Sequence, residues 1–319
     1  MVPSNLWVDN VLMVVAGPEQ LLAALIIEAV FGYPAWLLAR IGHPVMWVGR
    51  MIAAMDRRCN IGTQRRIMGT IAALLLIGTG GSAGLLIEHL ATGWSGTITV
   101  ILIASSGLAQ RSLHDHVAAV AQPLLNKDLD KARTALSMIV GRDTAVLDGT
   151  GITAAATETL AESFCDGVVA PAFWFLILGL PGLFAFKCIS TADSMIGHMD
   201  DRYRQFGWAS ARIDDVLNWL PARMSGALIC LAGGGGWRIL WRDAGNHLSP
   251  NAGWPESAMA GALGVRLGGG AAYDGEWIAR ETLGDGCPPT LATLKRAITI
   301  YHYACLLLWV AIGGAAWLL

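Results

Sequence analysis

Charged side chains are scarce in this chain. Asp, Glu, Lys and Arg make up 14% of its 319 residues, whereas hydrophobic residues make up 54%. A soluble globular domain usually carries about 25% charged residues. The net charge of −2 and the scattered basic residues give no general attraction to nucleic acid, so we expect no nucleic-acid partner. The composition predicts an integral membrane protein, with the lipid bilayer as its main surrounding.

Cysteine motifs are missing as well. The six cysteines form no CxxC pair and have no zinc spacing with histidine, which is typical of packing cysteines in a reducing compartment. The first residues lack a basic segment followed by a clean apolar core and a small-residue cleavage site. We therefore expect no cleavable signal peptide.

Long uncharged runs are what the chain does contain. Ile67–Ile87 has 21 residues without an ionisable side chain, enough to cross a bilayer as a helix. Further apolar runs cover Val11–Phe31, Trp94–Ala109, Val168–Phe186 and Tyr303–Leu319. We expect an all-α, polytopic membrane protein with about 4–5 transmembrane helices, forming a single membrane-embedded domain over residues 1–319.

Charge and helix breakers indicate how the runs are arranged. The connection from Arg40 to Arg66 has six arginines and is predicted to be cytoplasmic. Pro171, Gly179 and Pro181 interrupt Val168–Phe186, which favours a broken or re-entrant segment over a complete crossing. Met224–Trp237 is too short to span and is expected to be interfacial or partly inserted. Residues 110–167, with helical periodicity on both sides of Asn126–Asp128, and residues 187–300 are then largely cytoplasmic or interfacial connections that form the site.

Three acidic residues recur at helical spacing in the first candidate site. Glu158, Glu162 and Asp166 lie four residues apart and share one helical face. Like charges at that spacing destabilise a helix by about 0.2–0.5 kcal/mol per pair, a cost that a divalent cation would remove. The alternative is an acidic stripe that faces solvent. Arg142 before this stripe offers a cation for phosphate.

The second candidate site runs from Arg212 to Arg223. Asp214 and Asp215 repel each other unless a cation or arginine satisfies them. Asn218 follows Asp214 on the same helical face, and Pro221 is expected to end the helix and leave Arg223 at a turn. Asp193 and Ser194 offer further oxygen atoms that could bind a metal ion or a phosphate. Ordinary surface charge is the alternative interpretation.

Several ordered motifs resemble one family. They are HPV at His43–Val45, IVGRDT at Ile139–Thr144, ETLAESFCDGVVAPAFW at Glu158–Trp174, STADSMIGH from Ser190, ARIDDVLNWLPAR from Ala211 and SPNAGWPESAMAGALGVRLGG from Ser249. The chain resembles the CobD/CbiB adenosylcobinamide-phosphate synthases of cobalamin biosynthesis from about Glu28 to Gly275. It departs from the family pattern at Tyr33 and Ser163, where a carboxylate and an amide are usual.

The resemblance implies an ATP- and magnesium-dependent ligase in the cell inner membrane, with its site facing the cytoplasm. It would join the carboxylate of (adenosyl)cobyric acid to the amine of aminopropanol or its phosphate. Because a carboxylate is a poor acyl donor, ATP would first convert it to an acyl phosphate. Such chemistry needs carboxylates for magnesium, cations for phosphate and a base near the amine.

We assign candidate residues to these roles. Catalytic candidates are Glu158, Glu162, Asp166 and Asp215, and metal candidates are Glu158, Glu162, Asp166, Asp193, Asp214 and Asp215. Substrate-binding candidates are His43, Arg142, Ser194, Asn218, Arg223, Asn251 and Glu256.

Small residues follow the turn at Ser249. We expect the Ser249–Gly270 segment to enclose the flat corrinoid, with helix packing by the same small residues as the alternative interpretation. Other enzymes of the pathway or a second copy of the chain are candidate partners. A non-catalytic membrane regulator similar to the AmpE type and a transporter are the alternative functions.

Overall fold

The computed structural model describes residues 17–273 and 275–318. The signal-peptide prediction and the start of the first apolar run, residues 11–16, lie outside these ranges. Packing divides the chain into two compact units instead of gathering it around one core. Unit 1 takes the described residues up to Leu108, Pro171–Val216 and the chain from Ile312 onward; unit 2 takes Ala109–Ala170 and Leu217–Ala311.

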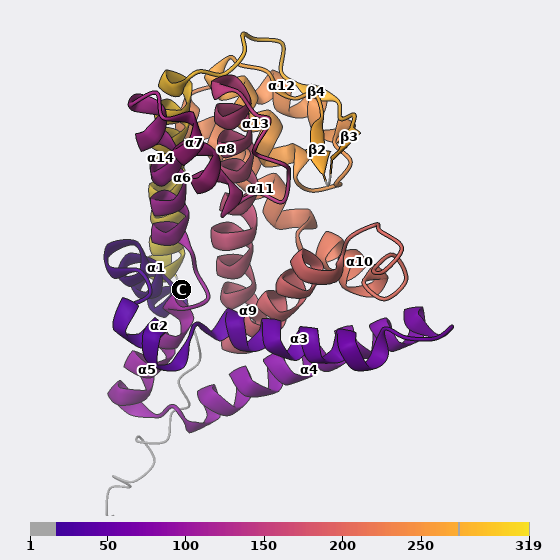
Figure 1. Cartoon of the computed structure of the whole chain (residues 1–319). Helices are drawn as coiled ribbons and strands as arrows, with labels where there is room; N and C mark the ends of the chain where they lie inside the picture. The colour runs from indigo at the N-terminus through magenta and orange to yellow at the C-terminus, as the bar shows by residue number, and fades with distance from the viewer. Residues whose placement is uncertain (1–16, 274, 319) are drawn as a thin grey trace, which may run out of the picture. The chain divides into compact units, whose positions relative to one another are not determined.

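Unit 1 is built from helices around an apolar core. In chain order they are α1 (Pro18–Phe31), α2 (Ala35–Ile41), α3 (Pro44–Cys59), α4 (Arg65–Leu90), α5 (Gly93–Ser105), α9 (Ala170–Ile196) and α10 (Trp208–Leu217). Figure 1 shows α3 and α4 running side by side. Their apolar faces meet α9 in a core that contains Ile52, Leu76, Ile196 and Phe206.

Small residues bring α4 against α9. A Cβ on Gly80 or Gly84 would lie within 3.0 Å of the α9 backbone, so only glycine permits this approach. Gly179 breaks α9 with a φ of 65°, which confirms that the run Val168–Phe186 is broken. The amide of Leu180 next to the break donates to Glu88 Oε1 at 2.7 Å. Glu88 thus accepts a hydrogen bond from a backbone amide that has no helical partner at the break.

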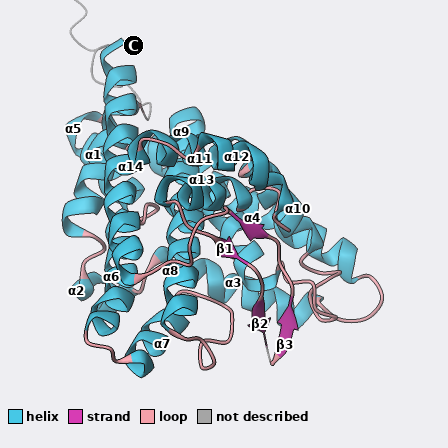
Figure 2. Cartoon of the chain, turned by 90° about the horizontal axis from the view of Figure 1, so that it is seen from above, coloured by secondary structure: helices cyan, strands magenta, loops and turns pink. Residues whose placement is uncertain are grey.

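Unit 2 carries the remaining elements. Its helices are α6 (Gln110–Leu125), α7 (Leu129–Ser137), α8 (Gly149–Phe164), the π-helical turn η1 (Cys165–Val169), α11 (Trp219–Gly233), α12 (Trp237–Asp243), the 3₁₀ turn η2 (Ala244–Asn246), α13 (Gly253–Leu263) and most of α14 (Leu291–Leu318). The helices expected on both sides of Asn126–Asp128 are confirmed. Two antiparallel pairs of short strands follow α13 and precede α14 along the chain: β1 (Leu267–Gly268) with β4 (Thr282–Leu283), and β2 (Ala271–Tyr273) with β3 (Glu276–Ile278). Figure 2 draws the strands in magenta.

Helix α13 lies at the centre of unit 2. Nearly all of its residues are buried, and it packs on α8, α11 and α12. A Cβ on Gly261 would lie 2.8 Å from Gly236 Cα and from Ile239 Cβ. Neighbouring elements therefore already contact the small residues of α13. At Gly261 this supports the helix-packing interpretation over the interpretation that a corrinoid approaches the backbone.

Three helical stretches are long and apolar enough to cross a membrane: Arg65–Leu90, Gly149–Ile196 and Leu291–Leu318. Two bent pairs bring the number to as many as five: Pro18–Phe31 with Ala35–Cys59, and Trp208–Leu217 with Trp219–Gly233. The expected all-α, multi-pass membrane fold is confirmed. The run Trp94–Ala109 is an exception, because α5 has only 13 residues and is too short to span alone. Most of Met224–Trp237 belongs to α11, in the second bent pair.

The segment Arg212–Arg223 differs from the expected geometry. α10 ends at Leu217, and Asn218 precedes α11, so Asp214 and Asn218 do not share one helix. Pro221 lies in the first turn of α11, where no helical N–H is needed, instead of ending a helix. Arg223 accordingly lies on α11 and not at a turn.

Gly261→Leu should lower the stability of unit 2 by about 1–3 kcal/mol or abolish folding, because the added side chain overlaps Gly236 and Ile239. Gly235→Ala is the matched control, since a Cβ there meets nothing within 4 Å. Thermal unfolding in detergent measures both. A Gly261→Leu protein as stable as the Gly235→Ala protein would contradict the packing.

Candidate functional site

Glu158 is the centre of a charged group buried inside unit 2. It lies on the buried face of α8 and is 2% exposed. Its Oε2 pairs with the Arg142 guanidinium, which the loop before α8 carries, and its Oε1 accepts from the Gly268 amide at 2.8 Å. Since an unpaired buried carboxylate costs several kcal/mol, these donors allow Glu158 to stay inside.

Arg280, in the loop between β3 and β4, extends the group. Its guanidinium lies 3.9 Å from Glu158 Oε2 and 4.0 Å from Glu256 Oε2. Its Nη2 is also 2.6 Å from His247 Nε2, and His247 Nε2 is 3.7 Å from Glu256 Oε1. We call Arg142, Glu158, His247, Glu256 and Arg280 the buried cluster.

Two members of the buried cluster have shifted acidities. Burial, and then the charges of Glu158 and Glu162, raise the pKa of Glu256 well above its ordinary value of 4.5, against the opposing effect of Arg280 and Arg142. Among the described residues, Glu256 Oε2 has no hydrogen-bond partner. Burial, followed by the charge of Arg280, lowers the pKa of His247. Beside the two arginines and Glu158, these shifts favour the protonated form of Glu256 and the neutral form of His247.

The β2–β3 hairpin is fastened to the same loop that carries Arg142. The Asp143 amide donates to the Ala272 carbonyl at 2.8 Å, and Asp143 Oδ2 accepts from the Gly275 amide at 2.8 Å. Gly268 and Arg280 flank this hairpin, so the hairpin and the loop bring their donors to α8 together.

The acidic stripe is only partly as expected. Glu158 faces the interior and is paired, so a stripe wholly open to solvent is wrong at this position. Glu162 is exposed, and Asp166 is half-buried in the π-helical turn. The described residues contain no group of three or more His, Cys, Asp or Glu side chains placed to hold a metal ion.

Three further candidate residues of unit 2 lie outside the buried cluster, and each has its own contacts. Asn251 is buried in the turn before α13, where Ser249 Oγ accepts from its amide at 3.2 Å. Asn218 is fully buried, with its Oδ1 3.8 Å from Cys165 Sγ. The Arg223 guanidinium stacks on the rings of Trp219 and Trp254, at 4.2 and 4.4 Å, and donates to the Trp219 carbonyl. Arg280, and not Arg223, is thus the second arginine that lies at Glu158 with Arg142.

The remaining candidates belong to unit 1. His43 caps α3, its Nδ1 accepting from the Val45 amide at 3.2 Å. The charges of Asp193 and Asp215 interact, and Arg212 lies 3.4 Å from Asp215 Oδ2. Asp214 is half-buried on α10, and the exposed Ser194 hydroxyl donates to the Ser190 carbonyl at 2.9 Å. Within unit 1, Asp193, Asp215 and Arg212 thus form one electrostatically linked group.

Sequence reasoning missed His247 and Arg280. His247 stands two residues before the SPNAGWPES motif, a position that could have drawn attention to it. Arg280 lies in a segment without a motif, and only the fold brings it to Glu158 and Glu256.

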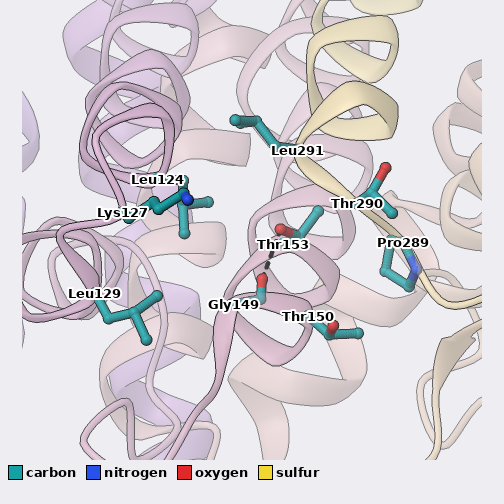
Figure 3. Close-up of a pocket in the computed structure, with 9 residues that line it drawn as sticks. All are labelled: Leu124, Lys127, Leu129, Gly149, Thr150, Thr153, Pro289, Thr290 and Leu291. Carbon is teal, nitrogen blue, oxygen red and sulfur yellow. Dashed lines mark hydrogen bonds between the residues drawn. The ribbon is translucent and has the colours of Figure 1, made fainter.

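Unit 2 also has a separate pocket of about 420 Å³ (Figure 3). Leu124, Leu129, Leu291 and Lys127 are among the side chains that line it, and the Thr153 hydroxyl donates to the Gly149 carbonyl there at 2.7 Å. None of the predicted site residues lines this pocket.

Comparison with known proteins places the chain in a family. The family described as CobD/Cbib protein matches residues 21–301. The chain belongs to the CobD/Cbib family. A Rhodobacter capsulatus protein named "Cobalamin biosynthesis protein CobD" is 47% identical over 303 residues, covering 93% of this chain and 96% of that protein. Proteins of the same name from Rhizobium meliloti and Geobacter metallireducens are 40% and 42% identical, covering 93% and 91% of this chain and 96% and 94% of their own lengths. No solved structure matches.

The raised pKa of Glu256 predicts a pH-dependent stability in this CobD/Cbib protein. Between about 4.5 and its raised folded pKa, the folded state holds a proton that the unfolded state has lost. The free energy of unfolding should therefore fall as pH rises through this window. Glu256→Gln should remove that fall, whereas Glu276→Gln, at an exposed position on β3, should keep the wild-type profile. Parallel unfolding profiles for wild type and Glu256→Gln would contradict the assignment.

Proposed function

We propose that this protein acts in cobalamin biosynthesis as an adenosylcobinamide-phosphate synthase, an ATP-dependent, amide-forming ligase. It would join the carboxylate of (adenosyl)cobyric acid to the amine of aminopropanol or aminopropanol phosphate. Membership of the CobD/Cbib family and the names of the relatives support the pathway. The observation that carries the ligase assignment is the meeting of two arginines with two glutamates in the interior of unit 2.

The arginines suit a phosphate-bearing substrate. The side chains of Arg142 and Arg280 are 12% and 13% exposed, so water screens their charges little. A guanidinium offers paired donors that match phosphate or carboxylate oxygens. An incoming anionic group would compete with Glu158 and Glu256 for these donors. The same charges would stabilise negative charge that develops on a transferred phosphoryl group.

Magnesium fits the acidic residues at the end of α8. Glu162 and Asp166 are oxygen donors one turn apart, and both are at least partly open to solvent. Magnesium in nucleotide sites commonly takes one or two carboxylates, with phosphates and water completing its shell, so a larger protein cage is not needed. Bound magnesium-ATP would supply the phosphoryl group that activates the corrinoid carboxylate.

The remaining assignments follow from this chemistry. Because ATP is a cytoplasmic substrate, we place the buried cluster on the cytoplasmic side of the inner membrane. Asn218 and Asn251 are proposed to contact substrate through their amides, and Asp193, Asp214 and Asp215 are proposed as a second acidic group that takes part in metal or substrate binding. The bilayer is the expected environment of the long apolar helices.

Purified protein given cobyric acid, ATP, magnesium and either amine should form the corresponding corrinoid amide, read as a mass increase. The form of the amine that reacts identifies the natural substrate. Arg142→Met should lower kcat/KM by about 10²-fold or more, since it removes a charged contact to phosphate. Arg266→Met, at an exposed arginine outside the cluster, is the control. A folded wild-type protein that forms no amide with either amine would favour a non-catalytic regulator or a transporter.

A further inference from the structure

His247 is held in a fixed position inside unit 2. It lies between η2 and the turn that leads into α13, with 10% of its side chain exposed. A Cβ on Gly253 would lie 2.2 Å from the Ala244 carbonyl oxygen and 2.6 Å from His247 Cβ, so the turn passes close to the histidine only because this residue is glycine. The ring is therefore a placed group of the buried cluster.

Arg280 determines which nitrogen of this ring carries the proton. A guanidinium only donates hydrogen bonds, and Arg280 Nη2 lies 2.6 Å from His247 Nε2. Each ring nitrogen therefore faces a donor, because the Ser249 amide also lies 3.0 Å from Nδ1. The guanidinium contact is shorter and charged, so we assign the lone pair to Nε2 and the proton to Nδ1, where the Ser249 carbonyl oxygen is 3.4 Å away. The lone pair of Nε2 is thus present but covered by a cation.

Charged groups reach the ring from every element packed against it. Arg280 approaches from the β3–β4 loop, Glu256 from α13 and Glu158 from α8, and Arg142 pairs with Glu158. Burial and Arg280 lower the pKa of His247, whereas Ser249 and Glu158 act against them. If the charge of Arg280 were taken up by an anion, the main charge that suppresses protonation of His247 would be neutralised.

We propose that His247 accepts a proton from the attacking amine, and that Arg280 masks Nε2 until an anionic substrate group draws the guanidinium away. This proposal rests on the proposed ligase function. One proton of the ammonium group passes to Nε2, and the freed nitrogen lone pair forms the C–N bond with the carboxyl carbon activated by ATP. The C–O bond to the leaving phosphate breaks with its electron pair, and the second amine proton leaves with phosphate.

The other groups of the buried cluster are poorer proton acceptors. Glu158 already accepts from Arg142 and from the Gly268 amide, so both of its oxygens are engaged. Burial raises the pKa of Glu256 well above its ordinary value, which favours the form that already carries a proton. His247 is the member of the cluster with an unprotonated nitrogen that a moving side chain can uncover.

Masking is tested by labelling His247 with diethyl pyrocarbonate, which modifies the unprotonated imidazole, and by following the site across pH with peptide mass spectrometry. Arg280→Gln should raise the alkaline labelling rate of His247 by about tenfold, because Nε2 loses a charged hydrogen bond. The pH of half-maximal labelling should also move upward. His116 in the same sample reports general reactivity, and Arg266→Gln is the matched control.

Wild-type protein supplies a test that needs no substitution. Inorganic pyrophosphate should accelerate labelling of His247, because it competes for Arg280, and should have no such effect in Arg280→Gln. Masking is overturned if neither the substitution nor pyrophosphate changes the labelling of His247 relative to His116.

Turnover tests the proton transfer. His247→Gln should lower kcat by about 10²-fold with an unchanged KM for ATP, and the residual kcat should rise with pH as more free amine forms. Wild-type kcat in His247→Gln overturns the proton-acceptor role while leaving the ligase function intact. Absence of ligation in the wild type overturns the function and the proton transfer together, whereas the labelling result still decides whether Arg280 masks His247.

Discussion

The ion pair between Arg142 and Glu158 is the constraint around which unit 2 is arranged. Glu158 faces the interior of a helix bundle, where an uncompensated carboxylate would cost about 3–5 kcal/mol. Its partners come from the loop before α8, from β1 and from the loop after β3. One buried charge therefore fixes two segments, far apart along the chain, against the same helix. These polar contacts add to apolar packing of the short strands, whose Leu267, Ala271 and Leu283 side chains are buried.

The same arrangement prepares the site for charged substrates. The two guanidinium groups lie beside Glu158 and Glu256, so under the proposed function an incoming phosphate or carboxylate would compete with these side chains for the guanidinium donors. Burial raises the pKa of Glu256 and lowers the pKa of His247, which favours the neutral form of each side chain. In the proposed mechanism, Arg280 moves to an incoming anion and His247 then takes up a proton.

Much of the fold was predictable from the sequence, but the environment of the site was not. Uncharged runs predicted the long helices, and Gly179 with Pro181 predicted the break in α9. The motifs predicted Arg142, Glu158 and Glu256 one by one, and the fold brings them together. Acidic residues four apart look the same whether the helix faces solvent or protein, so the burial of Glu158 could not be deduced. Arg280 acts through tertiary contacts across a hairpin, which no local pattern encodes. The prediction that Pro221 ends a helix was wrong. Proline disrupts the interior of a helix but is accepted in the first turn, which is where Pro221 lies in α11.

Hydrogen exchange with and without magnesium-ATP tests the central claim, that the buried cluster of unit 2 receives the nucleotide phosphates. Ligand contacts slow exchange of the amides they order, and peptide mass spectrometry assigns the effect to segments. We expect protection in residues 139–162 and 264–285, which carry Arg142, Glu158 and Arg280. Protection confined to residues 190–216, with both unit 2 segments unchanged, would contradict it.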